Sequence, residues 1–312
     1  MTTAFVFPGQ GSQAVGMGKE LAEALPEARE VFEEVDDALG LKLSAIMWEG
    51  PQDTLTLTEN AQPALMAVSV ATARAIARGG FALPDKVAFV AGHSLGEYSA
   101  LTATGAITLA DSARLLQRRG QAMQRAVPVG EGAMAALLGA EFDLAEEIVG
   151  AAAAEGVCQV ANDNGGGQSV ISGSRAAVDR AIEISKERGV KRAMQLPVSA
   201  PFHCALMQPA ADEMAEALAD VAISEPNVPV VANVTATAIF DPEMIRTLLV
   251  EQVTKMVRWR ESVLFMRDQG VDKMVEVGSG KVLAGLTKRI DRDIKAVSVS
   301  VPHDIDDFFK AL

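Results

Sequence analysis

Residues 86–98 read Lys86-Val87-Ala88-Phe89-Val90-Ala91-Gly92-His93-Ser94-Leu95-Gly96-Glu97-Tyr98, a buried-strand pattern followed at once by Gly-His-Ser-Leu-Gly and a helical pattern. Glycines two positions before and two positions after Ser94 let the backbone crowd into a sharp strand-to-helix turn. Such a turn, a nucleophile elbow, holds its serine at a helix N-terminus, where N–H groups and the helix dipole stabilise negative charge. Gly-x-Ser-x-Gly also occurs in ordinary turns, but the flanking strand and helix favour a nucleophilic serine.

Outside this stretch, short apolar runs alternate with amphipathic helical patterns. We expect strands at Ala4–Phe7, Val87–Ala91, Val228–Ala232, Met274–Val277 and Ala296–Val299. We expect helices at Lys19–Leu39, broken near Pro26, and at Ala61–Arg78, Ala110–Val127, Leu206–Val221, Pro242–Val257 and Lys281–Ile290. Strand runs separated by amphipathic helices are typical of a parallel sheet covered on both faces. The sequence therefore predicts an α/β fold with a parallel-sheet core.

Residues 127–198 follow a different order. The patterns predict, in turn, a strand at Met134–Leu138, a helix at Leu144–Ala154, strands at Val157–Ala161 and Ser169–Ser172, a helix at Ala176–Glu187 and a strand at Lys191–Leu196. The order βαββαβ is that of the ferredoxin-like unit. We therefore expect a small subdomain at 127–198, inserted into a large α/β catalytic subdomain of residues 1–126 and 199–312, with a cleft between them. The alternative is that these strands extend the main sheet.

The composition narrows the classes of protein to consider. The 312 residues suffice for one large α/β domain with an insert, and 49% of them are hydrophobic, so a sizeable core is available. The formal charge of -13 argues against nucleic-acid binding, which needs a basic face. No basic N-terminal start or spanning apolar run is visible, so we expect a cytoplasmic protein without membrane association. Cys158 and Cys204 can build neither a disulfide scaffold nor a zinc site, and both are expected as reduced thiols.

A serine nucleophile needs a base, and the chain contains three histidines. His93 directly precedes Ser94, and neighbours on an extended segment point to opposite sides, so packing beneath the turn is its expected role. His303 comes just before an acidic C-terminal helix, which is typical of a surface residue near an N-cap. His203 lies where the chain leaves the insert and re-enters the large subdomain at the cleft. Position favours His203 as the base, and a buried structural histidine is the alternative.

Two polar side chains lie on helix faces that are otherwise apolar. Arg119 lies in line with Leu115, Ala122 and Met123 within Ala110–Val127. A guanidinium on an inward face is costly unless it meets a carboxylate or a phosphate, so either an internal Asp or Glu or a substrate carboxylate is expected as its partner. Gln252 shares a stripe with Leu249, Val253 and Met256, and it also needs a partner.

A competing motif stands near the N-terminus. The run Gly9-Gln10-Gly11-Ser12-Gln13-Ala14 has the form G-x-G-x-x-A directly after a strand, as in dinucleotide-binding folds. Such a fold needs a second strand about 20 residues further on. Residues 20–39 are instead helical and acidic, so a tight loop that places a backbone N–H beside Ser94 is the favoured interpretation.

Five segments along the chain carry a resemblance to a known family. They are Phe7-Pro8-Gly9-Gln10-Gly11-Ser12-Gln13, Gly92-His93-Ser94-Leu95-Gly96-Glu97-Tyr98-Ser99-Ala100, Gln117-Arg118-Arg119-Gly120, Ser199-Ala200-Pro201-Phe202-His203 and Glu276-Val277-Gly278-Ser279-Gly280-Lys281-Val282-Leu283. In this order they resemble the malonyl-CoA:acyl carrier protein transacylases of bacterial type II fatty acid synthesis. The resemblance runs from residue 4 to about residue 300. It implies an α/β-hydrolase-like large subdomain with a ferredoxin-like insert.

The resemblance also implies roles for individual residues. Ser94 would be the nucleophile and His203 its base. Arg119 would bind the malonyl carboxylate, and the backbone N–H groups of Gln10 and Leu95 would form the oxyanion hole. Through its main-chain carbonyl, Gln252 would orient His203 in place of a triad carboxylate. The expected substrate-binding set is Arg119, Gln252, Asn162 and Met123.

The function implied is ping-pong transfer of a malonyl group from coenzyme A to the phosphopantetheine thiol of acyl carrier protein in fatty acid biosynthesis, without a metal or redox cofactor. A serine esterase or thioesterase with the same elbow and a dinucleotide-binding module are the alternatives. Because both expected partners are acidic, we expect a local basic patch on this acidic chain. The candidate residues form two clusters, Lys186, Arg188, Lys191 and Arg192 on the insert and Lys281, Lys288, Arg289 and Arg292 near the C-terminus.

Overall fold

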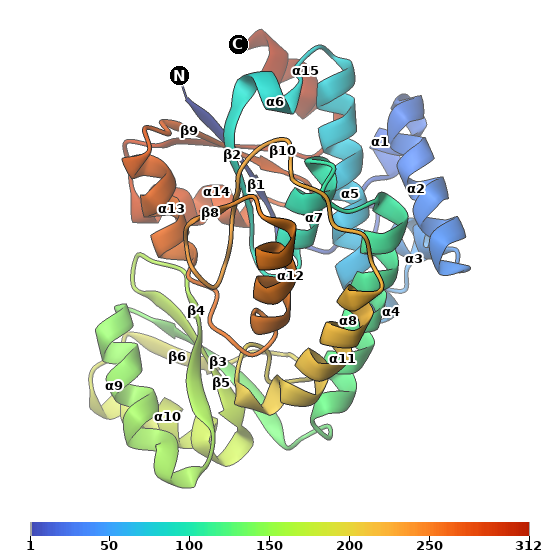
Figure 1. Ribbon diagram of the computed structural model, residues 1–312. Helices are drawn as coiled ribbons and strands as arrows, with labels where there is room; N and C mark the ends of the chain where they lie inside the picture. Colours follow the sequence, from blue (N-terminus) through green and yellow to red (C-terminus); the bar gives the residue numbers. More distant parts are fainter. Residues whose placement is uncertain (1, 312) are drawn as a thin grey trace.

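The computed structural model describes residues 2–311, which contain two separate sheets (Figure 1). The main sheet has six strands in the order β10-β9-β1-β2-β7-β8. All neighbouring pairs are parallel except β7 with β8, which is antiparallel. The strands are β1 (Thr3–Phe7), β2 (Val87–Gly92), β7 (Val230–Val231), β8 (Ala238–Ile239), β9 (Lys273–Val277) and β10 (Lys295–Val299).

Helices connect these strands and cover the sheet. Those before the small sheet are α1 (Lys19–Ala24), α2 (Pro26–Leu39), α3 (Leu43–Glu49), α4 (Gln52–Thr56), α5 (Thr58–Arg78), α6 (Leu83–Lys86), α7 (Gly96–Ala103) and α8 (Leu109–Ala126). Those after it are η2 (Ala205–Met207), α11 (Gln208–Ala219), α12 (Pro242–Glu251), α13 (Trp259–Asp268), α14 (Val282–Ile290) and α15 (Pro302–Lys310).

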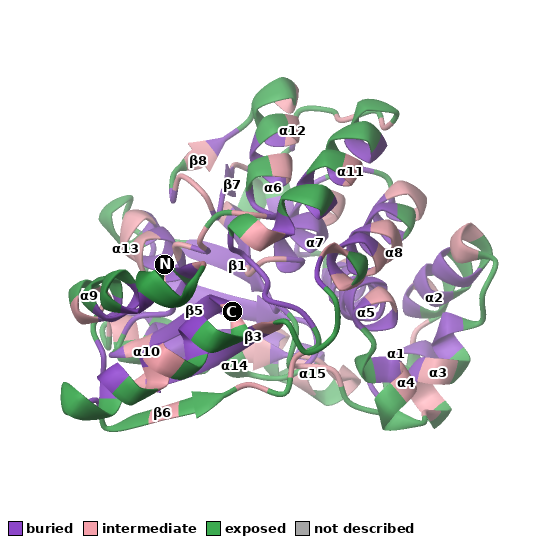
Figure 2. Cartoon of the chain, turned by 90° about the horizontal axis from the view of Figure 1, so that it is seen from below, coloured by how far each residue is buried: buried purple, intermediate pink, exposed green. Residues whose placement is uncertain are grey.

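Strand β1 shows how both faces of the main sheet are buried. Phe5 and Phe7 belong to the largest apolar core, which they share with side chains of α2, α5, α7 and α8. Ala4 and Val6, which point the opposite way, belong to a separate core with side chains of α13 and α14. Every residue of β1 is buried, and the strand is drawn as such in Figure 2. The apolar run without polar alternation therefore reflects a sheet covered on both sides.

The small sheet is antiparallel and has the order β4-β5-β3-β6. Its elements are β3 (Gly132–Leu138), α9 (Phe142–Ala152), η1 (Ala153–Glu155), β4 (Cys158–Asp163), β5 (Gln168–Ser174), α10 (Arg175–Glu187) and β6 (Arg192–Gln195). This is the predicted βαββαβ order, and the alternative that these strands extend the main sheet is wrong. Because the whole small sheet lies within 127–198, we propose these limits for the small subdomain and 1–126 with 199–312 for the large one.

The predicted helix Pro242–Val257 is wrong at its C-terminal end, because α12 ends at Glu251. The Val257 N–H donates to the Ala161 carbonyl at 2.9 Å, and the Val257 carbonyl accepts from the Asp163 N–H at 3.1 Å. These bonds to β4 replace the helical bonds that a continued helix would make. Helices α3, α4, α6 and α13 and strand β8 were not predicted from the sequence. All of them except α13, which has ten residues, are seven residues long or shorter.

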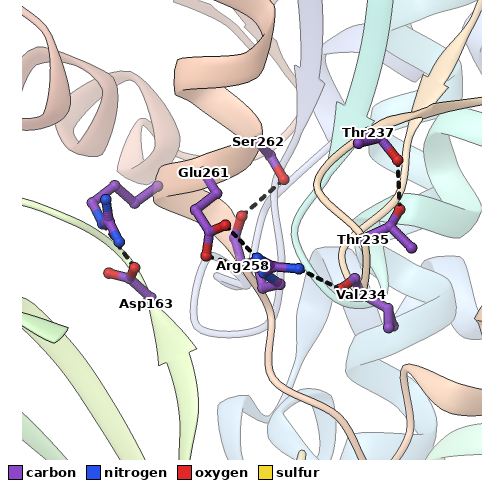
Figure 3. Close-up of polar contacts among 8 residues, drawn as sticks. Asp163, Val234, Thr235, Thr237, Arg258, Glu261 and Ser262 are labelled. Carbon is purple, nitrogen blue, oxygen red and sulfur yellow. Dashed lines mark hydrogen bonds and ion pairs between the residues drawn. The ribbon is translucent and has the colours of Figure 1, made fainter. Parts of the chain in front are cut away.

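An ion pair lies next to this contact between β4 and the segment that follows α12. Asp163, at the end of β4, accepts a hydrogen bond from Arg260 Nε of α13 at 2.8 Å. Figure 3 shows Asp163 facing α13, and beside it Arg258 contacting Glu261 and the carbonyl of Val234. The small sheet is therefore joined through β4 to α13 and to the segment that follows α12.

Between residues 2 and 311, none of the helices has the length and apolar character needed to cross a membrane.

Candidate active site

Ser94 occupies the sharp turn between β2 and α7 in a left-handed conformation, with φ 53°. The two flanking glycines are required by close backbone contacts. A Cβ on Gly92 would lie 1.9 Å from the Gly96 carbonyl carbon, and a Cβ on Gly96 would lie 2.3 Å from the Phe7 oxygen. A left-handed non-glycine residue costs free energy, and such strain is typical of functional sites. The predicted sharp strand-to-helix turn is thus present, with the serine at the N-terminus of α7.

The imidazole of His203 contacts Ser94 through one ring nitrogen and a main-chain carbonyl through the other. Its Nε2 is 2.8 Å from Ser94 Oγ, and its Nδ1 is 2.8 Å from the main-chain oxygen of Gln252. The carbonyl of Gln252 is free to accept this bond because α12 ends one residue earlier. With Nδ1 donating to that carbonyl, the unprotonated Nε2 faces the serine hydroxyl.

Burial, and after it the Arg119 guanidinium, lowers the pKa of His203 to about 3. The imidazole is 4% exposed and therefore stays neutral in the neutral pH range. A neutral imidazole is the form that can accept the serine proton.

Arg119 is 1% exposed and reaches the same point from α8. Its Nη2 donates to Ser94 Oγ at 3.1 Å and to Gln252 Oε1 at 3.0 Å, while its Nη1 donates to Gln62 Oε1 at 2.7 Å. All three acceptors are neutral. Within residues 2–311 no carboxylate forms an ion pair with this guanidinium, so the internal salt bridge considered from the sequence is not present. A buried guanidinium that no carboxylate contacts directly can bind an anionic ligand.

The two backbone N–H groups expected in the oxyanion hole come from two different loops, one after β1 and one after β2. Gln10 follows β1 and borders the cavity, and Leu95 precedes α7. Neither N–H donates a hydrogen bond to another group of the described chain. Both N–H groups are therefore left free to donate to an oxyanion.

A cavity of about 410 Å³ opens onto these groups. Its walls come from both subdomains and include, besides Ser94, His203 and Arg119, the side chains of Gln62, Met123, Asn162, Val198, Phe202, Leu283 and Leu286. Asn162 and Met123 therefore line the cavity. Gln252 does not, because it lies beneath Arg119 and is fully buried.

Of the remaining histidines, His303 has the exposed position expected from the sequence, whereas His93 borders the cavity instead of packing beneath the turn. His93 Nε2 lies 3.0 Å from Asn164 Oδ1, and its ring packs against Trp259 with centroids 5.6 Å apart. His303 is exposed on α15, next to Asp307. Neither contacts Ser94 Oγ.

The glycine motif after β1 does not open a dinucleotide-binding unit. After the loop the chain continues into α1 and α2, and the next strand in sequence is β2 at Val87–Gly92. Gly9 instead packs on His93, where a Cβ would lie 2.7 Å from the His93 carbonyl oxygen. The loop thereby brings Gln10 to the elbow.

Sequence reasoning missed three residues that hold this site. Gln62 bonds to Arg119, Asn233 accepts the Ser94 N–H at 2.7 Å, and Glu97 accepts from Asn233 and Gln252. Asn233 follows β7 at the carboxyl end of a parallel strand, where polar site residues collect, and this signal could have identified it. Gln62 and Glu97 lie within helical segments whose spacing gives no such indication.

Comparisons with known proteins agree with this geometry. Residues 4–304 match the family model described as acyl transferase domain. The chain is 46% identical over 304 residues to the malonyl CoA-acyl carrier protein transacylase of Bacillus subtilis (strain 168), covering 97% of this chain and 95% of that protein. A crystal structure of acyl-carrier-protein-S-malonyltransferase from Bartonella henselae has 57% sequence identity to this chain and a TM-score of 0.98. The match covers 100% of this chain and 99% of that one.

A third relative is a malonyl-transacylase whose structure was solved in complex with its type II PKS acyl-carrier protein. It is 41% identical to this chain, with a TM-score of 0.97 and complete coverage of both chains. The chain belongs to the acyl transferase family and, within it, to the malonyl CoA-acyl carrier protein transacylases.

Proposed function

We propose that this chain is an acyl-carrier-protein S-malonyltransferase of fatty acid biosynthesis, which moves a malonyl group from coenzyme A to the phosphopantetheine thiol of acyl carrier protein through an acyl-serine. One observation carries the proposal: Arg119, buried without a carboxylate partner, contacts the same Ser94 Oγ that lies 2.8 Å from His203 Nε2. A nucleophile and its base therefore stand beside a fixed positive charge. This arrangement fits an acyl group that ends in a carboxylate.

In the first half-reaction His203 Nε2 takes the Ser94 proton while Oγ attacks the malonyl thioester carbon. The carbonyl oxygen becomes an oxyanion, and the N–H groups of Gln10 and Leu95 stabilise it. His203 then returns the proton to the departing coenzyme A thiolate, leaving malonyl on Ser94. The Gln252 carbonyl holds the imidazole throughout, in the place that a carboxylate takes in serine hydrolases.

In the second half-reaction the phosphopantetheine thiol gives its proton to His203 and attacks the malonyl ester. The tetrahedral intermediate uses the same oxyanion hole, and collapse returns the proton to Ser94 Oγ as malonyl leaves on the carrier. The proposed cycle needs no cofactor beyond the thioester substrates. Asn162 and Met123 would contact the acyl chain or the pantetheine arm from the cavity wall.

Acceptor choice separates this proposal from a thioesterase with the same elbow. We expect isolated malonyl-enzyme to lose malonyl slowly in buffer and at least ~10²-fold faster when holo-carrier protein is added, with malonyl recovered on the carrier. The measurement is intact mass of enzyme and carrier over time. Loss to water at the same rate with and without carrier would contradict the proposal and favour hydrolysis.

A basic surface on α14 is our choice for carrier docking. Leu283 and Leu286 line the cavity from α14. The four exposed cations of the C-terminal cluster lie on or beside the same helix: Lys281, Lys288, Arg289 and Arg292. Arg289 Nη1 also donates to Oε1 of Gln168, a cavity residue, at 3.0 Å. In the cluster on the small subdomain, by contrast, Arg188 pairs with Glu147. An acidic carrier would meet the α14 cluster at the cavity mouth.

We therefore expect Lys288→Glu to raise the Michaelis constant for carrier protein by about 5- to 10-fold, because the charge reversal opposes an acidic partner within a screening length of about 10 Å. Malonylation of Ser94 by malonyl-CoA should change far less. Lys186→Glu, which reverses an exposed lysine of the other cluster, is the matched control. A larger effect of Lys186→Glu, or no effect of salt on the second half-reaction, would show that the α14 cluster is not the docking surface.

A further inference from the structure

Glu97 is a buried carboxylate that the proposed reaction does not use. It lies in the first turn of α7, three residues after Ser94, and is 1% exposed. Its Oε2 accepts hydrogen bonds from the Asn233 N–H at 3.0 Å and from Gln252 Nε2 at 2.8 Å. Both donors are neutral amides, and no ion pair holds the carboxylate in the described part of the chain. Burial raises the pKa of Glu97 to about 7, although these bonds and the Arg119 charge lower it. A costly buried acid with such partners requires an explanation.

Gln252, one of the two partners, connects Glu97 to the Arg119 guanidinium. The Gln252 amide lies between the two charges: its Nε2 donates to Glu97 and to the Ser94 carbonyl at 3.1 Å, and its Oε1 accepts from Arg119. A carboxylate can only accept hydrogen bonds and a guanidinium can only donate them. A flipped amide would put oxygen against Glu97 and NH₂ against Arg119. Glu97 therefore fixes the orientation in which Gln252 presents an acceptor to Arg119.

Asn233, the other partner, connects Glu97 to Ser94. While its N–H donates to Glu97, Asn233 accepts the Ser94 N–H with Oδ1 at 2.7 Å and donates to the Gly92 carbonyl with Nδ2 at 2.6 Å. The Asn233 carbonyl also accepts from the Arg258 N–H at 3.1 Å, next to the contacts drawn in Figure 3. The elbow is thus attached to the loop after β7 through Asn233, and that loop is attached to Glu97.

We propose that Glu97 is a positioning residue, whose acceptor oxygen aligns Gln252 and Asn233 so that Arg119 and Ser94 keep their mutual arrangement. His203 depends on the same carboxylate indirectly, because its Nδ1 bonds to the main-chain oxygen of Gln252. This inference rests on the proposed function, since it assigns Arg119 to the acyl carboxylate. Glu97 itself touches no substrate.

Two conservative variants separate the position of this oxygen from its charge. Glu97→Gln keeps an acceptor oxygen at the same distance from the backbone but removes the charge. Glu97→Asp keeps the charge but withdraws the oxygen by about 1.5 Å, one carbon–carbon bond. We expect Glu97→Asp to lower kcat for malonyl transfer by roughly 10- to 100-fold and to reduce the ratio of malonyl to acetyl transfer. Glu97→Gln should stay within about 3-fold of wild type for kcat, with the ratio retained.

The matched control is Asp36 on α2, another buried carboxylate with two hydrogen-bond donors, which also has Lys42 Nζ 3.6 Å from its Oδ2. It accepts from the Ser44 N–H at 2.9 Å and from Ser44 Oγ at 2.7 Å, and it does not border the active-site cavity. Asp36→Asn and Asp36→Glu should change thermal unfolding without changing kcat or the malonyl-to-acetyl ratio. The same thermal unfolding measurement on the Glu97 variants checks that each is folded under the assay conditions.

The order of the two Glu97 variants decides the inference. Glu97→Asp impaired in kcat and ratio, with Glu97→Gln near wild type, supports it. Glu97→Asp equal to or better than Glu97→Gln, or an unchanged ratio in both, overturns it. If wild-type enzyme forms no malonyl-Ser94, the proposed function itself is contradicted; if wild type transfers malonyl normally, a failed variant order contradicts only the role of Glu97.

Discussion

His203→Ala should lower the rate of Ser94 malonylation by roughly 10⁴-fold while leaving the fold intact. The imidazole is the only ring within hydrogen-bonding distance of Ser94 Oγ among residues 2–311, at 2.8 Å, so its loss leaves the hydroxyl without a base. The measurement is a rapid-quench time course of enzyme acylation by malonyl-CoA. His303→Ala, which removes an exposed histidine on α15, is the control and should acylate at the wild-type rate. A His203→Ala enzyme within ten-fold of wild type would exclude His203 as the base, since general-base catalysis contributes at least about 10²-fold.

The pH dependence of the same half-reaction gives an independent check. Burial and the Arg119 charge lower the pKa of His203 to about 3, so the imidazole remains neutral where an ordinary histidine, with a pKa of about 6.5, becomes protonated. A lowered pKa preserves the proton-accepting form on acidification. We therefore expect no loss of activity from His203 as the pH falls through the ordinary histidine range. Any inflection near neutral pH should disappear in Glu97→Gln, because burial raises the pKa of Glu97 to about 7.

Arg119→Ala should reduce kcat/KM for malonyl-CoA roughly 30- to 900-fold, which corresponds to a loss of about 2 to 4 kcal/mol of transition-state stabilisation. Acetyl-CoA has no terminal carboxylate and should lose much less, so the malonyl-to-acetyl ratio should fall. The physical reason is that no internal carboxylate contacts the buried guanidinium, and we propose that the malonyl carboxylate does so. Kinetics with both thioesters measure the ratio.

Arg118→Ala is the matched control for that experiment. Arg118 is the neighbouring arginine on α8, but it is partly exposed and pairs with Glu213 at 3.1 Å. Its removal should leave both acyl groups unaffected. Equal losses of malonyl and acetyl transfer in Arg119→Ala would show that Arg119 stabilises the site without selecting the acyl group.

The sequence predicted the elements that have strong local patterns. The strand-turn-helix around Ser94 is set by an apolar run and by two glycines whose Cβ atoms would clash with the backbone. The small sheet followed from a change in element order along residues 127–198. The stripe on α8 showed that Arg119 faces inward, and the structure buries it.

The rest depended on contacts between distant segments, which no local pattern records. The end of α12 is fixed by bonds between Val257 and β4, about 95 residues earlier in the chain, so periodicity extended the helix too far. The partners of Glu97 come from the loop after β7 and from the residue after α12. The sequence likewise left the partner of Arg119 undecided between an internal and a substrate carboxylate. Helical spacing shows which face of the helix a side chain occupies, but not which neighbouring group it contacts.

The most direct test of the central claim is the intact mass of the enzyme after brief mixing with malonyl-CoA, for wild type and for Ser94→Ala. The alanine variant keeps the cavity, Arg119 and His203 and removes only the atom that lies 2.8 Å from the imidazole. We predict that wild type gains the mass of one malonyl group, located by peptide mapping at Ser94, and that Ser94→Ala gains none. An unmodified wild-type enzyme that still transfers malonyl, or a malonylated Ser94→Ala enzyme, would contradict acyl transfer through Ser94.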